Sequence, residues 1–76
     1  MVIPDSVTSI GNSAFMDCRS LTSVYYEGTA EEWGRISIGA SNSYLTNATR
    51  YYYSETQPTE EGNWWHYDEN GEVVVW

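Results

Sequence analysis

The sequence predicts a strand-rich α+β fold with a short repeat unit, a capping helix and a C-terminal antiparallel hairpin. Three observations lead to this prediction. An apolar-Thr-Ser-apolar phrase occurs twice, at Val7–Ile10 and at Leu21–Val24. A helix-capping pattern follows at Thr29–Glu32, and an Asn-Gly pair at Asn70–Gly71 separates two apolar segments. The chain has 76 residues, which corresponds to one domain.

The two copies of the apolar-Thr-Ser-apolar phrase are predicted to form short strands. Thr is β-branched, and its restricted χ1 angle favours an extended backbone. Gly11 follows the first copy and permits a sharp turn, after which Asn12 or Ser13 can cap a helical turn that includes Phe15. Cys18 is the single cysteine and is expected to act as a small buried apolar residue.

A third and looser copy of the phrase lies at Leu45–Ala48. The spacing from Leu21 to Leu45 falls within the period of roughly 20–29 residues that is typical of leucine-rich repeats. In such proteins one unit cannot bury its own apolar face, so neighbouring units must cover it. The remainder of the chain is therefore expected to stack on the repeat unit and to close it.

The segment Ile3–Cys18, with the pattern I-P-x-S-V-T-S-I-G-x-x-A-F-x-x-C, resembles the BspA-type leucine-rich repeat of bacterial surface and secreted proteins. The segment Tyr25–Trp33 also resembles the way in which such arrays end. This resemblance implies a leucine-rich-repeat solenoid fragment in an extracellular or cell-surface location. About one full repeat is present, where these families have many, which implies the C-terminal end of a longer parent.

We divide the chain into three segments of one domain. Residues 1–28 are the leucine-rich repeat unit, 29–54 contain the capping helix and the last strand of the solenoid, and 55–76 contain a connector and the C-terminal hairpin. The helix is expected from Ala30 to Ile36, since Thr29 and Glu32 form a capping box.

Trp33 is expected to lie over the open end of the solenoid as a lid. Its competing role is that of a ligand-stacking side chain. Residues 38–47 are predicted to be a loop, and 49–54 a strand with Tyr51 and Tyr53 on one face and Arg50 and Tyr52 on the other. The hairpin is expected to join or pack on this strand, because an isolated hairpin is marginal in water.

The composition excludes several classes of partner. The chain has 11 acidic residues against three Arg and no Lys, which gives a formal net charge of −8. Nucleic acid and anionic membrane surfaces attract clustered basic residues, so neither is an expected partner. No apolar run approaches the ~20 residues of a membrane span, and Met1–Ile3 lacks the basic n-region of a signal peptide. Extracellular location therefore follows from the resemblance alone.

The N-terminal end is expected to self-associate. A core of this size supplies only ~3–5 kcal/mol, and oligomerisation is a common remedy. In a longer array another repeat would cover this end. Here four apolar residues are predicted to contribute to an exposed patch with an unpaired strand edge, namely Val2, Ile3, Val7 and Ile10.

No set of residues indicates catalysis, so we expect no enzyme, no cofactor and no metal. His66 is the only histidine, and it lies far from Cys18 in the sequence. The one feature that indicates ligand binding is the aromatic hairpin, which resembles the choline- and glucan-binding repeats of bacterial cell walls. The residues that would stack on a ligand are Trp64, Trp65, Tyr67 and Trp76. The competing interpretation is that the Trp side chains form the packed face of the hairpin.

The resemblance implies a non-catalytic structural and interaction module. It would close the C-terminal end of a leucine-rich-repeat array in a bacterial surface or secreted protein, and the parent array would bind protein partners. The alternative is a weak carbohydrate- or choline-binding module that uses the aromatic hairpin.

Overall fold

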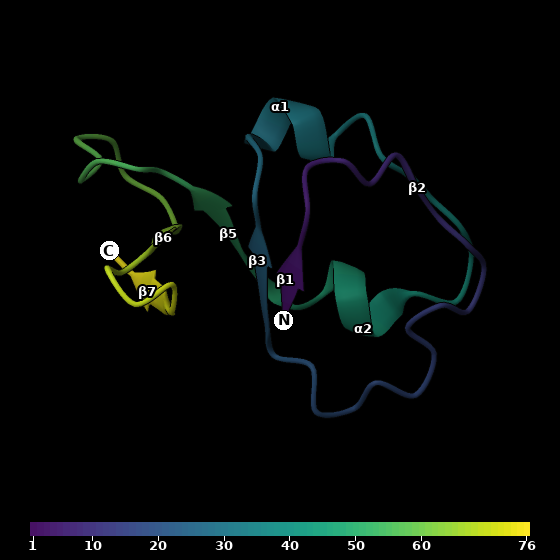
Figure 1. Cartoon of the computed structure of the whole chain (residues 1–76). Helices are drawn as coiled ribbons and strands as arrows, with labels where there is room; N and C mark the ends of the chain where they lie inside the picture. The colour runs from purple at the N-terminus through teal and green to yellow at the C-terminus, as the bar shows by residue number, and fades with distance from the viewer.

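The computed structural model describes residues 1–76 and shows a mixed α+β chain rich in strands (Figure 1). Five strands form the main sheet in the order β1-β3-β5-β6-β7, and β2 pairs separately with β4. The strands are β1 (Val2–Ile3), β2 (Ser9–Ile10), β3 (Ser23–Tyr26), β4 (Ser37–Ile38), β5 (Thr49–Tyr53), β6 (Trp64–Tyr67) and β7 (Val73–Val75), and the helices are α1 (Ala30–Trp33) and α2 (Ser43–Thr46). The predicted strand-rich α+β class is confirmed.

The main sheet is parallel except at its last strand. β3 pairs in parallel with β1 on one side and with β5 on the other, and β5 pairs in parallel with β6. Only β6 and β7 run antiparallel. Ile3, Tyr26 and Tyr52 consequently lie side by side across three strands. The sheet is curled like half a barrel, with the hairpin at one end and the coil that contains α1 and α2 at the other (Figure 1).

The core lies inside the coil, against one face of β1 and β3. Val24 and Tyr26 from β3 are 0% and 1% exposed. Trp33 from α1 is also buried, and its ring meets the ring of Tyr26 edge to face at 5.2 Å between centroids. The Arg50 guanidinium lies 4.7 Å from the centroid of the Trp33 ring. Trp33 thus has a packing role. The buried core residues are Ile3, Ile10, Val24, Tyr26, Trp33, Ile36 and Leu45.

The two copies of the apolar-Thr-Ser-apolar phrase form strands in different sheets. The first copy, Val7–Ile10, contains β2, which pairs with β4. The second copy, Leu21–Val24, leads into β3 at the inside of the main sheet. Ile10 and Val24 nevertheless belong to the same core. The third copy is not a strand. Its first residue, Leu45, belongs to helix α2 and is 1% exposed.

Two local predictions differ from the structure. Around Phe15 only isolated turns form, because Ser13 and Asp17 have φ angles of 62° and 61°, which lie outside the right-handed helical region. Phe15 is half-buried and packs against the core. The predicted loop at 38–47 includes the last residue of β4 and the whole of α2.

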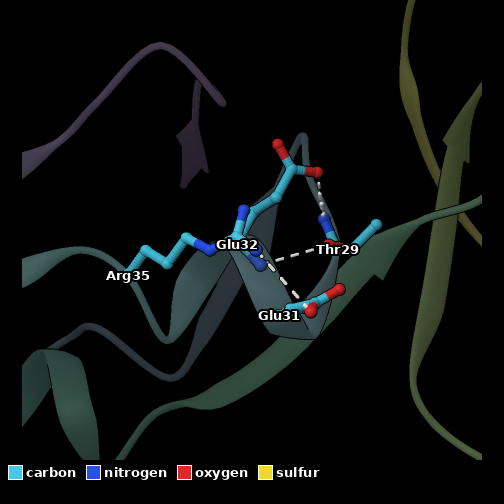
Figure 2. Close-up of polar contacts among 4 residues, drawn as sticks. All are labelled: Thr29, Glu31, Glu32 and Arg35. Atoms are coloured by element: carbon cyan, nitrogen blue, oxygen red, sulfur yellow. Dashed lines mark hydrogen bonds and ion pairs between the residues drawn. The ribbon is translucent and has the colours of Figure 1, made fainter.

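Helix α1 begins with the predicted capping box (Figure 2). The Glu32 backbone N–H donates to Thr29 Oγ1 at 3.1 Å, and the Thr29 N–H donates to Glu32 Oε1 at 3.1 Å. The helix is shorter than predicted and ends at Trp33. The Gly34 N–H still donates to the carbonyl four residues back, but those of Arg35 and Ile36 donate to carbonyls three residues back. An exposed ion pair joins Arg35 to Glu31 at 3.6 Å, and such pairs contribute at most ~0.5 kcal/mol.

Asn42 closes the corner of the coil between β2 and α2. It is the one buried polar side chain, at 3% exposure. Its Nδ2 donates to the carbonyls of Gly11 and Gly39 at 3.0 Å and of Ala40 at 3.3 Å, and its Oδ1 accepts the Phe15 N–H at 2.9 Å. The Asn42 side-chain amide is therefore hydrogen-bonded to backbone groups of two loops. Such partners are needed because a buried polar group without a hydrogen bond is destabilising.

The C-terminal hairpin is confirmed, and it joins β5 through β6 as expected. The Asp68 carboxylate accepts the N–H groups of Asn70 and Glu72 at 2.8 and 2.9 Å, and Gly71 takes a φ of 79° that favours glycine.

The N-terminal patch is smaller than predicted. Ile3 and Ile10 are buried at 5% and 8% exposure, and Val7 is half-buried. Of the four expected residues only Val2 is exposed, at 37%. The predicted patch is wrong in this respect, because a single coil already covers the two isoleucines. Self-association through this end stays a prediction.

Replacing Asn42 with Ala should lower the free energy of unfolding by about 1–3 kcal/mol, because several backbone groups lose their buried partner. Urea unfolding followed by Trp fluorescence measures this change. Asn63→Ala is the matched control, since Asn63 is exposed. Equal midpoints for the two variants would show that Asn42 does not hold the corner.

Candidate functional site

An aromatic cluster covers the face of the sheet opposite the core. We define it as Tyr25, Tyr51, Tyr53, Trp65 and Tyr67. Alternation along β3, β5 and β6 places these side chains on one face. Tyr25 stacks on Tyr51 at 5.1 Å between centroids, and the Trp65 ring meets three neighbours edge to face, at 5.8 Å from Tyr25, 5.3 Å from Tyr53 and 4.8 Å from Tyr67.

Trp65 is the centre of the aromatic cluster and is not available to a ligand. Its side chain is 0% exposed. Its Nε1 donates to the backbone carbonyl of Tyr26 at 2.7 Å, so β6 reaches across β5 to β3. This contact curls the sheet around the ring. The predicted ligand-stacking role of Trp65 is wrong in this structure, because every face of the ring is covered.

The other predicted stacking residues lie on two different faces. Tyr67 belongs to the aromatic cluster. Trp64 points to the opposite face of the sheet, where its ring packs against the Tyr52 ring with 6.4 Å between the centroids. The Trp76 ring stacks on the His66 ring with 3.8 Å between the centroids, and Trp76 Nε1 donates to the Ser54 carbonyl at 2.7 Å. The hairpin therefore does not present one continuous aromatic surface.

Trp64 borders an open hollow of about 340 Å³ formed with the connector. Its Nε1 is buried and has no hydrogen-bond partner. The connector residues that line this hollow are mostly polar, and they are Ser54, Thr56, Gln57, Pro58, Thr59 and Glu60.

A second hollow, of about 260 Å³, lies at the carboxyl ends of the parallel strands. Asp5 follows β1, Glu27 follows β3, Tyr53 ends β5 and Tyr67 ends β6, and these four residues line it. The Tyr67 hydroxyl donates to Glu27 Oε2 at 2.7 Å. We call this site the acidic hollow, because two carboxylates line it and no basic side chain does.

Two tyrosines have raised pKa values, and one of them, Tyr67, lines the acidic hollow. The hydrogen bond to Glu27 raises the pKa of Tyr67, and burial adds to this effect. Burial raises the pKa of Tyr26, with further contributions from the negative charges of Glu32 and Asp5. At Tyr67, the hydrogen bond to Glu27 and the negative field of that carboxylate favour the neutral phenol. The same field attracts a cation, and Tyr rings provide faces on which a cation can rest.

Sequence reasoning found Tyr67 but missed Asp5, Glu27 and Tyr53. Each of these residues lies at or just beyond the end of a strand. The carboxyl ends of parallel strands meet at one edge of a sheet, which is where ligands bind in open α/β sheets. The position of these residues at strand ends indicates a site only once the strands are known to be parallel.

No group of three or more His, Cys, Asp or Glu side chains is placed to hold a metal ion. Cys18 is a free, half-buried thiol. Neither helix is long or apolar enough to cross a membrane.

Comparison with known proteins gives no identity. No protein-family model, no curated protein and no solved structure matches this chain.

Alkaline pH should destabilise the fold through Tyr26 and Tyr67. Their folded-state pKa values lie above the ordinary 10.0, so the stabilisation is present below about pH 10 and is lost as the pH rises through the raised values. Urea unfolding at a series of pH values measures this dependence. In Tyr67→Phe the loss above pH 10 should be shallower. Tyr44→Phe, at an exposed position on α2, is the control and should follow the parent. An identical alkaline loss in the parent and Tyr67→Phe would contradict the assignment.

Proposed function

We propose that this chain is a non-catalytic structural and interaction module of the leucine-rich-repeat type. It closes the C-terminal end of a repeat array in a bacterial surface or secreted protein, and the array binds protein partners. The observation that supports this proposal is the parallel register of β1, β3 and β5. Ile3 pairs with Tyr26, and Tyr26 pairs in turn with Tyr52. Both spacings along the chain lie within the period of roughly 20–29 residues found in leucine-rich repeats.

The two ends of the sheet support a direction for the array. The outer edge of β1 is free to accept another parallel strand, and Val2 is exposed beside it. At the other end β7 runs antiparallel to β6, which ends the succession of parallel strands. The hairpin thus acts as the closure, and a preceding coil stacks on β1.

Lengthening the array by one coil tests this proposal. An extra copy of residues 2–24 is inserted between Met1 and Val2, so that the original Val2 takes the place of Tyr25 in the added coil. The insertion should raise the denaturant midpoint of unfolding, because neighbouring repeats stabilise one another. The matched control carries Asp in place of Val24 in the added copy only, and it should show no gain. Equal midpoints for the parent and both insertions would refute the stacking role.

The alternative function is a weak carbohydrate- or choline-binding module. The acidic hollow favours it, since Tyr53 and Tyr67 lie there beside Asp5 and Glu27. The ligand would then bind at the end of β5 and β6 instead of over the Trp side chains of the hairpin. A quaternary ammonium suits this site better than a neutral sugar, because the carboxylates add a charge interaction to the ring faces.

Titration of the whole chain with choline and, separately, with glucose tests the alternative. Choline should give a saturable fluorescence change in the millimolar range. The double variant Asp5→Asn and Glu27→Gln keeps the shape of the site and should bind choline about tenfold more weakly or worse. Glu60→Gln, at an exposed position beside the other hollow, is the control. The absence of any saturable change with either ligand would rule this function out.

A further inference from the structure

β7 is an exposed, uncharged edge strand. It pairs with β6 on one side only and forms the end of the main sheet. Its residues Val73, Val74 and Val75 are 37%, 36% and 45% exposed. β7 contains no Pro, Lys or other charged residue of the kind that natural proteins use to block such edges.

The hydrogen bonds of the hairpin show which groups of β7 are free. The Trp76 N–H donates to the Trp64 carbonyl at 3.0 Å, and the Asp68 N–H donates to the Glu72 carbonyl at 2.9 Å. Bonded and non-bonded residues alternate along an antiparallel ladder, so Val74 is bonded toward β6. Val73 and Val75 therefore direct their N–H and C=O groups outward from the edge.

Contacts within a single copy of the chain fix the conformation of the β7 edge. The indole Nε1 of Trp76 donates to the Ser54 carbonyl at 2.7 Å, and the ring stacks on His66. At the other end the Asp68 carboxylate holds the turn through two backbone N–H groups. A preformed edge loses little conformational entropy when it pairs.

We propose that two copies of this chain pair through β7 in an antiparallel register centred on Val74. Val73 of each copy lies opposite Val75 of the other, and each such pair exchanges both of its N–H···O bonds. Val74 faces its own counterpart on the two-fold axis. The positions with outward backbone groups match in this register, so the edge is self-complementary.

The charges agree with this register. Glu72 of one copy falls opposite Trp76 of the other, so the two Glu72 side chains do not face each other across the new pair. Like charges directly opposite would destabilise it. A two-fold pairing closes on itself and leaves no further edge at β7, so the assembly stops at the dimer through this surface. The main sheets of the two copies become one continuous sheet.

A second copy is favoured over a basic peptide because the edge itself is apolar and uncharged. This choice has a measurable consequence. Each copy has a net charge of −8, so the two copies repel at long range and salt strengthens their association. A basic peptide would instead bind more weakly as salt rises.

Sedimentation equilibrium of the full chain over a concentration series tests the proposal. We expect a monomer–dimer equilibrium whose dissociation constant falls several-fold between ~0.02 M and ~0.5 M salt. Amide hydrogen exchange adds a site-specific readout. The amides of Val73 and Val75 should gain protection as the concentration rises, whereas that of Val74 should be protected throughout. A monomer at every concentration and salt level would overturn the proposal.

Two variants separate this edge from the rest of the molecule. Val75→Pro removes an outward N–H that the monomer does not use, and Pro is tolerated at such edge positions. It should remain folded, with Trp fluorescence like that of the parent, and dimerise at least about tenfold more weakly. Val75→Thr keeps the backbone donor and should dimerise like the parent. Val2→Lys, on the opposite edge β1, should also leave the dimer intact. Loss of the dimer in Val2→Lys but not in folded Val75→Pro would assign association to the N-terminal end and overturn the proposal.

Discussion

The hydrogen bond from the Trp65 indole to the Tyr26 carbonyl links the C-terminal hairpin to the strand that carries the core residues Val24 and Tyr26. It joins β6 to β3 across the intervening β5 and is fully buried. A buried indole N–H without a partner would cost about 1–3 kcal/mol, so the curl of the sheet and the burial of the ring depend on each other. The positions of Tyr53 and Tyr67 around the acidic hollow follow from this curl.

The coil has a separate constraint at Asn42. The sequence after Cys18 corresponds to the sequence after Asn42, since each of these residues is followed at the same distance by a Leu-Thr pair. This correspondence would place Val24 beside Ala48, but β3 and β5 pair at a longer offset that places Val24 beside Arg50. Helix α2, which lies before β5, accommodates the longer offset between β3 and β5 and buries Leu45. Asn42 satisfies the backbone of the resulting corner, whereas Cys18 at the corresponding position is only half-buried.

The two edges of the main sheet differ in chemistry, and the proposals use that difference. β1 is a two-residue parallel edge next to the core, which suits stacking of another coil. β7 is an antiparallel valine edge fixed by Trp76, which suits pairing with an identical edge. The acidic hollow lies between them at the ends of the parallel strands. An array could therefore extend at β1 while copies pair at β7, without either contact obstructing the other.

The sequence by itself determined the features that depend on near neighbours. The capping box at Thr29, the strand alternation around Tyr52 and the turn before Gly71 each involve residues within about four positions, so local chemistry is sufficient. Only the tertiary structure decided that Trp65 is buried while the adjacent Trp64 lies on the other face. It also decided that two copies of one phrase enter different sheets. These outcomes depend on groups that are distant in the chain, such as the Tyr26 carbonyl, and periodicity cannot specify which distant partner a side chain meets.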